Sequence, residues 1–261
     1  MEHFVWNIDP VMLALGPITI HWYGAIFASS IFAGLSYMKW IYQQENQNVE
    51  SLDNLLVYVV VGIIIGARLG HCFFYEPSYY FANPLKILAI WEGGLASHGG
   101  GLGAIIGSYL YTKKNPLSFI WLLDRLAIAT ALFGIFVRSA NFVNAEIIGK
   151  ASDVPWAVIF QRVDNVARHP AQLYEALAYG LIFISLTLLY KLTKAKSYQG
   201  MLLGMFLIMT FTARFIIEFF KQQQAAYTIE TSLNTGQMLS IPFFIVGVVL
   251  VIWSIKNKVK V

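Results

Sequence analysis

The sequence predicts an all-α integral membrane protein with about seven transmembrane helices and a small outward-facing head. Of its 261 residues, 57% are hydrophobic and only 12% are charged, about half the charged fraction of a soluble protein. The mean hydropathy is +0.61. The hydrophobic residues also fall into separate runs of about 20 residues, the length that an α-helix needs to cross a bilayer.

Seven apolar runs come close to this length. The third is the weakest because glycines crowd its beginning, and it could instead form a re-entrant segment followed by a short span. Together the spans would make residues 1–261 a single polytopic membrane domain. In chain order they cover roughly residues 18–40, 55–75, 94–111, 117–137, 173–192, 200–220 and 238–255.

The lysines support seven spans and give them a direction. With the N-terminus outside and the C-terminus in the cytoplasm, nine of the twelve lysines fall on the cytoplasmic side, as the positive-inside rule predicts. Removing any one span would scatter these lysines over both sides. The nine are Lys39, Lys113, Lys114, Lys191, Lys194, Lys196, Lys256, Lys258 and Lys260.

Two connections on the outer side are long. Residues 76–93 are rich in aromatic side chains and are expected to lie as an amphipathic segment in the headgroup layer. Residues 138–170 form the largest polar stretch and are expected to build the head. Within that stretch, residues 156–160 have the composition of a β-strand.

Several classes of protein are excluded by composition and motif. A single cysteine, Cys72, permits neither an intrachain disulfide nor a multi-cysteine metal site. The net charge of +4 is spread along the chain, so no nucleic-acid partner is expected. The chain contains no His-Glu-x-x-His zinc motif and no Gly-x-Ser-x-Gly nucleophile elbow. We therefore expect neither a metal nor another cofactor.

The arginines suggest where a ligand binds. A guanidinium is costly in hydrocarbon, so an arginine in an apolar run is a candidate site residue. Arg68, Arg138 and Arg214 lie within or at the ends of such runs. They predict an anionic ligand near the outer surface. A structural alternative for Arg214 is an ion pair with Glu218, four residues later on the same helix face.

Three polar blocks accompany these arginines. Residues 92–103 surround His98 with glycines at the start of an apolar run, which suits either close approach of a ligand to the backbone or tight helix packing. In residues 138–149, Arg138 and Asn141 would share a face if the fourth helix continued; otherwise they end a helix in water. Residues 168–175 are more simply a helix start with a polar cap.

These blocks resemble those of the prolipoprotein diacylglyceryl transferase family. The similarity covers nearly the whole chain, from His21-Trp-Tyr-Gly to Gln237-Met-Leu-Ser-Ile-Pro, with the three blocks and Arg214-Phe-x-x-Glu-Phe between them in order. The resemblance implies a multi-pass enzyme of the bacterial cytoplasmic (inner) membrane. Such an enzyme moves a diacylglyceryl group from phosphatidylglycerol to the lipobox cysteine in the signal peptide of a preprolipoprotein, and releases glycerol 1-phosphate.

The resemblance also assigns roles to individual residues. His98, Arg138 and Arg214 match the family's catalytic histidine and arginines, and Arg138 also matches its phospholipid-binding arginine. We expect His98 to assist deprotonation of the acceptor thiol or to act only in positioning, and the two arginines to hold the phosphate. The remaining expected substrate-binding residues are Asn141, Tyr23, Gly149, Asn144 and Glu146. Tyr23 would otherwise belong to the interfacial aromatic belt.

The chain departs from the family pattern at several positions. Ala140 and Ala145 stand where glycines are usual, and Thr210 replaces a common tyrosine. After Glu218 the chain continues to Lys221-Gln-Gln-Gln-Ala instead of Arg-x-Pro-Asp. The alternative to an enzyme is a non-enzymatic lipid or solute transporter, which would need a second polar layer near the cytoplasmic face.

Overall fold

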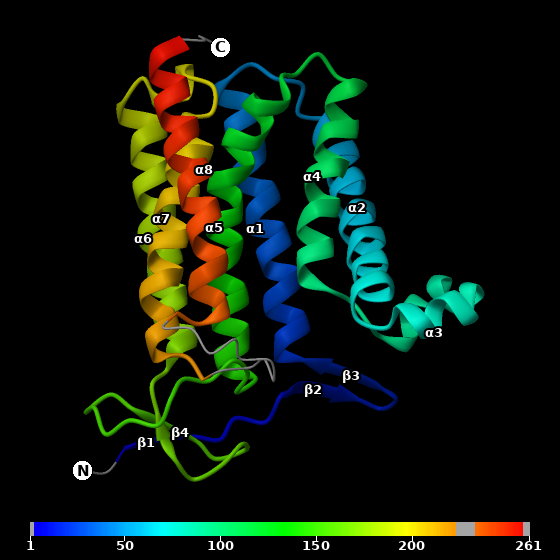
Figure 1. The fold of residues 1–261 in the computed structure, drawn as a ribbon, viewed down its shortest axis with the longest axis vertical. Helices are drawn as coiled ribbons and strands as arrows, with labels where there is room; N and C mark the ends of the chain where they lie inside the picture. Colours follow the sequence, from blue (N-terminus) through cyan, green and yellow to red (C-terminus); the bar gives the residue numbers. More distant parts are fainter. Residues whose placement is uncertain (1–2, 223–232, 258–261) are drawn as a thin grey trace. The chain divides into compact units, whose positions relative to one another are not determined.

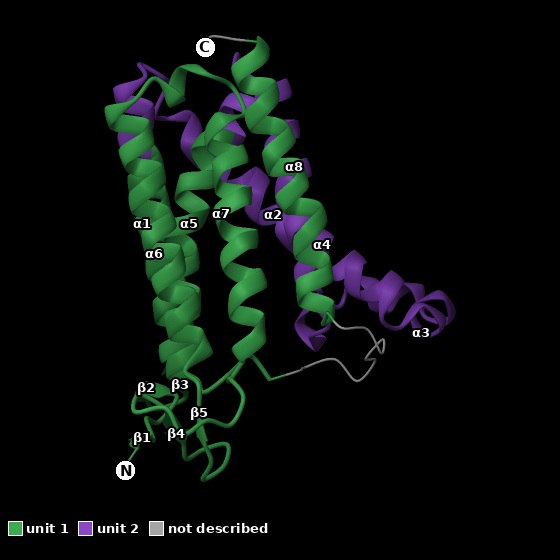
Figure 2. Ribbon diagram, turned by 60° about the vertical axis from the view of Figure 1, so that its left-hand side comes forward, with its two compact units in different colours: residues 1–38, 124–261 green, residues 39–123 purple. Residues whose placement is uncertain are grey.

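The computed structural model describes residues 3–222 and 233–257. Over these ranges the protein is mainly helical, and it divides into two compact units (Figure 2). We call residues 1–38 with 124–261 the large unit and residues 39–123 the small unit. Lys258, Lys260 and residues 223–225, which were part of the sequence argument, lie outside the described residues.

Long helices that run side by side form most of the large unit (Figure 1). The last residues of α1 and the first residues of α5 belong to the small unit. Within the large unit, Tyr37 of α1 hydrogen-bonds to Thr187 of α6 over 2.9 Å, and Phe27 of α1 packs edge-on against Phe133 of α5. The helices are α1 (Trp22–Gln44), α5 (Phe119–Val143), α6 (Ala171–Leu192), α7 (Met201–Ile217) and α8 (Thr235–Asn257).

Asp124 explains how α7 begins. Its fully buried carboxylate accepts the backbone N–H groups of Gly200 at 2.7 Å and Leu203 at 2.8 Å. The first turn of a helix has N–H groups without helical partners, so this carboxylate caps α7 from a neighbouring helix. The adjacent Arg125 lies 3.8 Å from Asp124 and donates to the carbonyl of Lys196. This pair therefore has a structural role.

Short strands gather at one end of the large unit's helices (Figure 1). β1 (Phe4–Trp6) pairs in parallel with β4 (Val158–Phe160), which pairs antiparallel with β5 (Ala167–Arg168). Phe142, at the end of α5, packs with Val158 and Phe160 under this sheet. The strand expected within residues 156–160 is thus confirmed for its last three residues.

A β-hairpin precedes the first helix and corrects one predicted boundary. β2 (Val11–Leu15) pairs antiparallel with β3 (Ile18–His21), and Gly16 turns between them at a φ of +60°. The prediction that a membrane helix starts at residue 18 is therefore wrong, because the β-branched residues there pair with β2. The helix begins at Trp22.

The small unit is built on two closely packed helices, α2 (Ser51–Phe74) and α4 (Ser97–Lys113). Glycines face each other along their seam, and a Cβ on Gly103 would overlap the carbonyl group of Gly62. α4 is one continuous helix, and the choice between a full span and a re-entrant segment followed by a short span stays a prediction. The connection between the two helices holds α3 (Pro77–Ala82) and the 3₁₀ turns η1 (Pro84–Leu88) and η2 (Ile90–Glu92).

Five helices of the described chain are long and apolar enough to cross a membrane. They are α2, α5, α6, α8, and α7 together with the 3₁₀ turn η4 (Glu218–Phe220) that follows it. The protein is therefore a multi-pass membrane protein. α4 falls outside this set because its 17 residues rise only about 26 Å, at about 1.5 Å per residue, against a hydrocarbon core of about 30 Å.

Candidate functional site

The polar end of α5 forms a continuous helical face. α5 extends to Val143 instead of ending near residue 137, so Arg138 and Asn141 lie one turn apart on the same side. Nη1 of Arg138 donates to Oδ1 of Asn141 over 3.2 Å. Only 4% of Asn141 is exposed. The face is turned into the protein, which excludes the alternative of a helix end facing water.

A chain of alternating charges connects Arg138 to two other elements. Nε of Arg138 lies 3.0 Å from Oε2 of Glu175 in α6. The other oxygen of Glu175 lies 3.3 Å from Nζ of Lys221, and that ammonium lies 3.6 Å from Oε2 of Glu218. Glu175 and Lys221 are both buried. We call Arg138, Glu175, Lys221 and Glu218 the ion-pair chain.

Glu146 fixes the two carboxamides of the predicted site. Its carboxylate accepts from Nδ2 of Asn141 at 2.9 Å and from Nδ2 of Asn144 at 2.8 Å. The backbone oxygen of Glu146 accepts from Gln172 at the start of α6. Because the amide nitrogen of Asn141 is held by Glu146, its carbonyl oxygen faces Arg138. The expected residues of the 138–149 block are therefore coupled to one another.

Arg214 joins this site through a small cavity. The cavity has a volume of about 20 Å³ and is lined by Arg138, Arg214, Tyr179 and Thr210, among others. Such a volume holds about one water molecule or one ligand oxygen. The Thr210 hydroxyl is buried and has no hydrogen-bond partner among the described residues. The cavity thus places two guanidinium groups, the carboxylate of Glu175 and an unused hydroxyl around one space.

The charge of Arg214 is not balanced in the way that its sequence spacing suggested. α7 ends at Ile217, and Glu218 starts the 3₁₀ turn η4, where its carboxylate approaches Lys221. Among residues 3–222 and 233–257, no ion pair joins Arg214 to Glu218. The structural alternative for Arg214 is therefore not supported, and an anion is the natural partner for its guanidinium.

Gly149 belongs to the packing around this site. Its N–H donates to the carbonyl of His169, and the residue bridges to Lys221 in an antiparallel ladder. A Cβ at Gly149 would lie 2.7 Å from Cβ of His169 and 2.9 Å from the carbonyl oxygen of Phe220. A glycine is needed here because three segments meet backbone to backbone, whereas the resemblance had suggested contact with substrate.

Tyr23 lies on the same side of the large unit as the site. It is half-buried near the start of α1, where its ring stacks with Phe27. Its phenol interacts electrostatically with Glu146 and Arg138. Tyr23 therefore lies within electrostatic range of Glu146 and Arg138, and its contact with substrate stays a prediction.

Two other arginines have structural partners. Arg68 is 3% exposed and donates to the carbonyl groups of Lys86, Ile87, Gly93 and Gly94, all in the connection between α2 and α4. Its guanidinium orders this connection, so the expectation that it binds an anion is not supported.

Arg168 is the second of these arginines, and it pairs with Asp164 over 2.5 Å. That hydrogen bond holds the pKa of the Asp164 carboxyl below its usual range. The charge of Arg168 is therefore compensated by a carboxylate four residues earlier in the chain.

His98 is exposed at the beginning of α4 in the small unit. The residue before α4 is Ala96, whose side chain cannot cap the first turn of this helix. Arg138 and Arg214 belong to the large unit. The expected convergence of His98 with the two arginines therefore stays a prediction.

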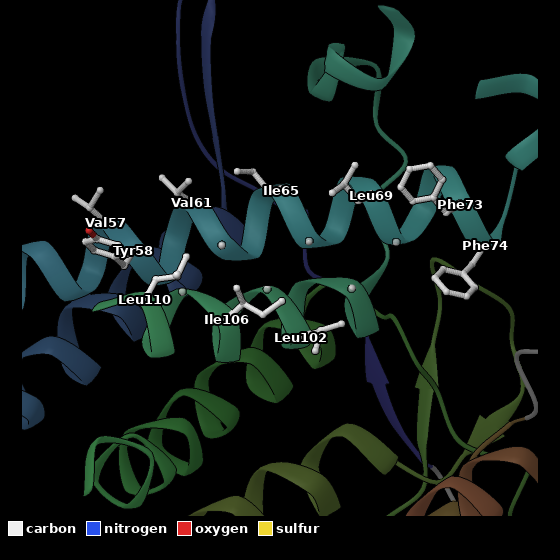
Figure 3. Close-up of a pocket in the computed structure, with 16 residues that line it drawn as sticks. Val57, Tyr58, Val61, Ile65, Leu69, Phe73, Phe74, Leu102, Ile106 and Leu110 are labelled. Atoms are coloured by element: carbon white, nitrogen blue, oxygen red, sulfur yellow. The ribbon is translucent and has the colours of Figure 1, made fainter. Parts of the chain in front are cut away.

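An apolar groove runs along the seam of α2 and α4 (Figure 3). Its volume is about 610 Å³, and its walls include Val61, Ile65 and Leu69 from α2 and Leu102 and Ile106 from α4. Glycines of both helices line the floor. This lining suits hydrocarbon and offers nothing to a polar solute.

Three residues of the candidate site were not predicted from the sequence. Glu175 was assigned to a helix cap, Lys221 was treated only as a departure from the family pattern, and Tyr179 was not considered. A signal for Lys221 was present, because it is one of only three lysines placed on the outer side and it directly follows an apolar run. Tyr179 lies inside an apolar run without a distinguishing neighbour, so no local signal marked it.

The fold and the site together define a multi-pass membrane protein with a fixed cationic site at one end of its helices. A family model described as prolipoprotein diacylglyceryl transferase matches residues 10–253, and the chain belongs to this family.

Relatives along the full length agree with this assignment. A protein of Tolumonas auensis is 51% identical over 98% of this chain and 99% of its own length. A protein of Chloroherpeton thalassium is 47% identical over 98% of this chain and 96% of its own, and one of Bacteroides fragilis is 41% identical over 97% and 96%. All three are named phosphatidylglycerol–prolipoprotein diacylglyceryl transferase.

Proposed function

We propose that this protein transfers a diacylglyceryl group from phosphatidylglycerol to the lipobox cysteine of preprolipoproteins. The product is a thioether, and glycerol 1-phosphate is released. The observation that carries the proposal is the cavity shared by Arg138 and Arg214, where the charge of Arg214 has no carboxylate partner among the described residues. Two converging guanidinium groups suit a phosphate better than any neutral ligand.

The reaction needs stabilisation of a leaving phosphate. The sulfur of the acceptor cysteine attacks the glyceryl carbon, and the bond from that carbon to the phosphate oxygen breaks. The electron pair remains on the phosphate, which leaves as part of glycerol 1-phosphate with increased negative charge. Arg138 and Arg214 are placed to stabilise this charge as it develops. Asn141, held by Glu146, orients Arg138 and offers its carbonyl oxygen to the headgroup.

The acceptor thiol must also lose its proton. A free thiol has a pKa of about 8.5, so only a small fraction is thiolate at neutral pH. We assign this activation to His98, because imidazole is the side chain best suited to accept a proton at neutral pH. In this scheme His98 takes the thiol proton while Arg138 and Arg214 stabilise the negative charge on the phosphate.

The membrane arrangement proposed here has seven spans. α1 and α4 would join the five helices that are long and apolar enough to cross, with the N-terminus outside and the C-terminus in the cytoplasm. Residues 138–170 would form a head on the outer face of the bacterial cytoplasmic membrane. Asp124 and Arg125 do not provide the second polar layer that a transporter needs. Asp124 caps the start of α7, and Arg125 donates to the carbonyl of Lys196.

An assay of the purified full chain tests the proposal. The protein is incubated in detergent with phosphatidylglycerol and a synthetic lipobox peptide, and the peptide is analysed by mass spectrometry. We expect a diacylglyceryl adduct with wild-type protein. Its absence under conditions where the protein remains folded would contradict the proposed function.

A conservative variant tests the phosphate site. Arg138→Lys should lower turnover by at least tenfold, because lysine keeps the charge but cannot supply Nε to Glu175 and Nη1 to Asn141 at once. Arg162→Lys is the matched control, since Arg162 is an exposed arginine in the head. Equal turnover of Arg138→Lys and wild type would remove Arg138 from the phosphate site.

A further inference from the structure

Arg138 is already engaged by a carboxylate. Its Nε faces Oε2 of Glu175 at 3.0 Å, and both side chains are largely shielded from water. An anionic ligand at Arg138 must therefore compete with Glu175, because a carboxylate and a phosphate make the same kind of contact with a guanidinium. If no cation offset it, the negative charge of Glu175 would also repel an incoming phosphate.

Lys221 lies where it can reduce this competition. Its ammonium is 3.3 Å from the second oxygen of Glu175, and only 8% of the residue is exposed. Lysine is almost never buried without a partner. The backbone around Lys221 is fixed as well, since Phe220 accepts from the N–H of Lys150 and Gln222 donates to Ile148.

The charge balance of the site depends on this lysine. The ion-pair chain contains two cations and two carboxylates and is neutral as a whole. Arg214, which lines the same cavity as Arg138, adds one positive charge that no carboxylate of the ion-pair chain balances. Without Lys221 the same set of groups would be neutral, and Glu175 would interact with Arg138 alone.

We propose that Lys221 is a positioning residue that shares Glu175 with Arg138 and so keeps Arg138 available to the phosphate of the substrate. Lys221 itself does not touch the reacting atoms. It acts through Glu175, whose negative charge it offsets by pairing with the carboxylate oxygen that does not face Nε of Arg138. This inference rests on the proposed function, because it assumes a phosphate ligand at Arg138.

A double-mutant cycle on the full chain tests this coupling. Lys221→Met should raise the KM for phosphatidylglycerol about tenfold with a smaller change in kcat, because the variant weakens binding of the phosphate. Glu175→Gln removes the charge through which Lys221 acts. The KM of Glu175→Gln should therefore equal that of the double variant Glu175→Gln/Lys221→Met. Lys221→Arg should retain most of the wild-type affinity.

Two controls separate this role from a merely structural one. Lys150→Met removes an exposed lysine whose backbone N–H donates to the carbonyl of Phe220, and it should leave KM unchanged. If Lys221→Met yields less folded protein because the buried Glu175 loses one of its two cationic partners, the comparison between Glu175→Gln and the double variant still decides, since neither of these two proteins carries a buried carboxylate at that position.

The results that would contradict the role of Lys221 differ from those that would contradict the proposed function. An unchanged KM in folded Lys221→Met overturns the inference, as does a further rise in KM when Lys221→Met is added to Glu175→Gln. In both cases wild-type protein still transfers the diacylglyceryl group. Failure of the proposed function would instead appear as no adduct with wild-type protein.

Discussion

Individual polar side chains in this protein divide into those that line the candidate site and those that hold the backbone in place. Arg68 and Arg138 look alike in the sequence, since each lies in an apolar stretch. The structure separates them by their partners, because Arg68 donates to four carbonyl groups of one connection whereas Arg138 faces a cavity. A buried arginine therefore indicates a functional site only after its hydrogen bonds are known.

The role of His98 can be decided by its dependence on pH. If His98 is the base, His98→Gln should lower turnover by about 100-fold or more at neutral pH, and the residual rate should rise with pH as free thiolate forms. Mass-spectrometric rates between pH 6 and 9 measure both effects. A His98→Gln protein with near wild-type turnover and an unchanged pH profile would exclude proton transfer by this imidazole.

Gly149 should tolerate no side chain. Gly149→Ala places a methyl group against His169 and the carbonyl of Phe220, and overpacking of this kind costs about 1–3 kcal/mol. The expected result is a lower midpoint of thermal unfolding in detergent. Gly180→Ala is the control, because a Cβ there has only one neighbour, at 4.0 Å. Unchanged stability of Gly149→Ala together with lost activity would instead favour direct contact with substrate.

At the scale of elements, glycine spacing decides how α2 and α4 meet. Gly62 and Gly103 approach backbone to backbone, which is possible only without side chains. The sequence left open whether the glycines around residues 94–111 serve a ligand or packing. The structure assigns those that face α2 to packing, and leaves Gly93 and Gly94 to shape the turn before α4 with φ values of +87° and +72°.

Two glycines of the same helix make this assignment testable. Gly103→Ala should lower the midpoint of thermal unfolding, because its Cβ would overlap the carbonyl of Gly62. Gly101→Ala should leave the midpoint unchanged or raise it, since a Cβ there meets open space and alanine is the better helix former. Similar behaviour of the two variants would show that the α2–α4 seam is not held by close backbone contact.

For the whole molecule, hydrophobic patterning predicted the long helices well and the segments that precede or connect them poorly. Runs of about 20 apolar residues located α2, α5, α6, α7 and α8, because the bilayer imposes this length on any span. Residues 18–21 were misassigned, since an apolar run before a helix looks the same whether it is helical or pairs with another strand.

The candidate site was predictable only in part. Arg138 and Asn141 could be placed on one face because helical periodicity fixes their relation. The contacts of Glu175, Lys221 and Thr210 come from three segments that are distant in sequence, and no local pattern contains that information. These three residues come together because α6, α7 and the segment after η4 meet in the folded protein.

The burial of Cys72 has a practical consequence for studying the reaction. This residue is the only cysteine of the chain, and none of its surface is exposed. A maleimide or iodoacetamide reagent added to an assay will therefore alkylate the acceptor peptide and spare the folded enzyme. The same property lets a cysteine introduced at a chosen outer or inner position serve as the sole reporter of sidedness, without first replacing a native thiol.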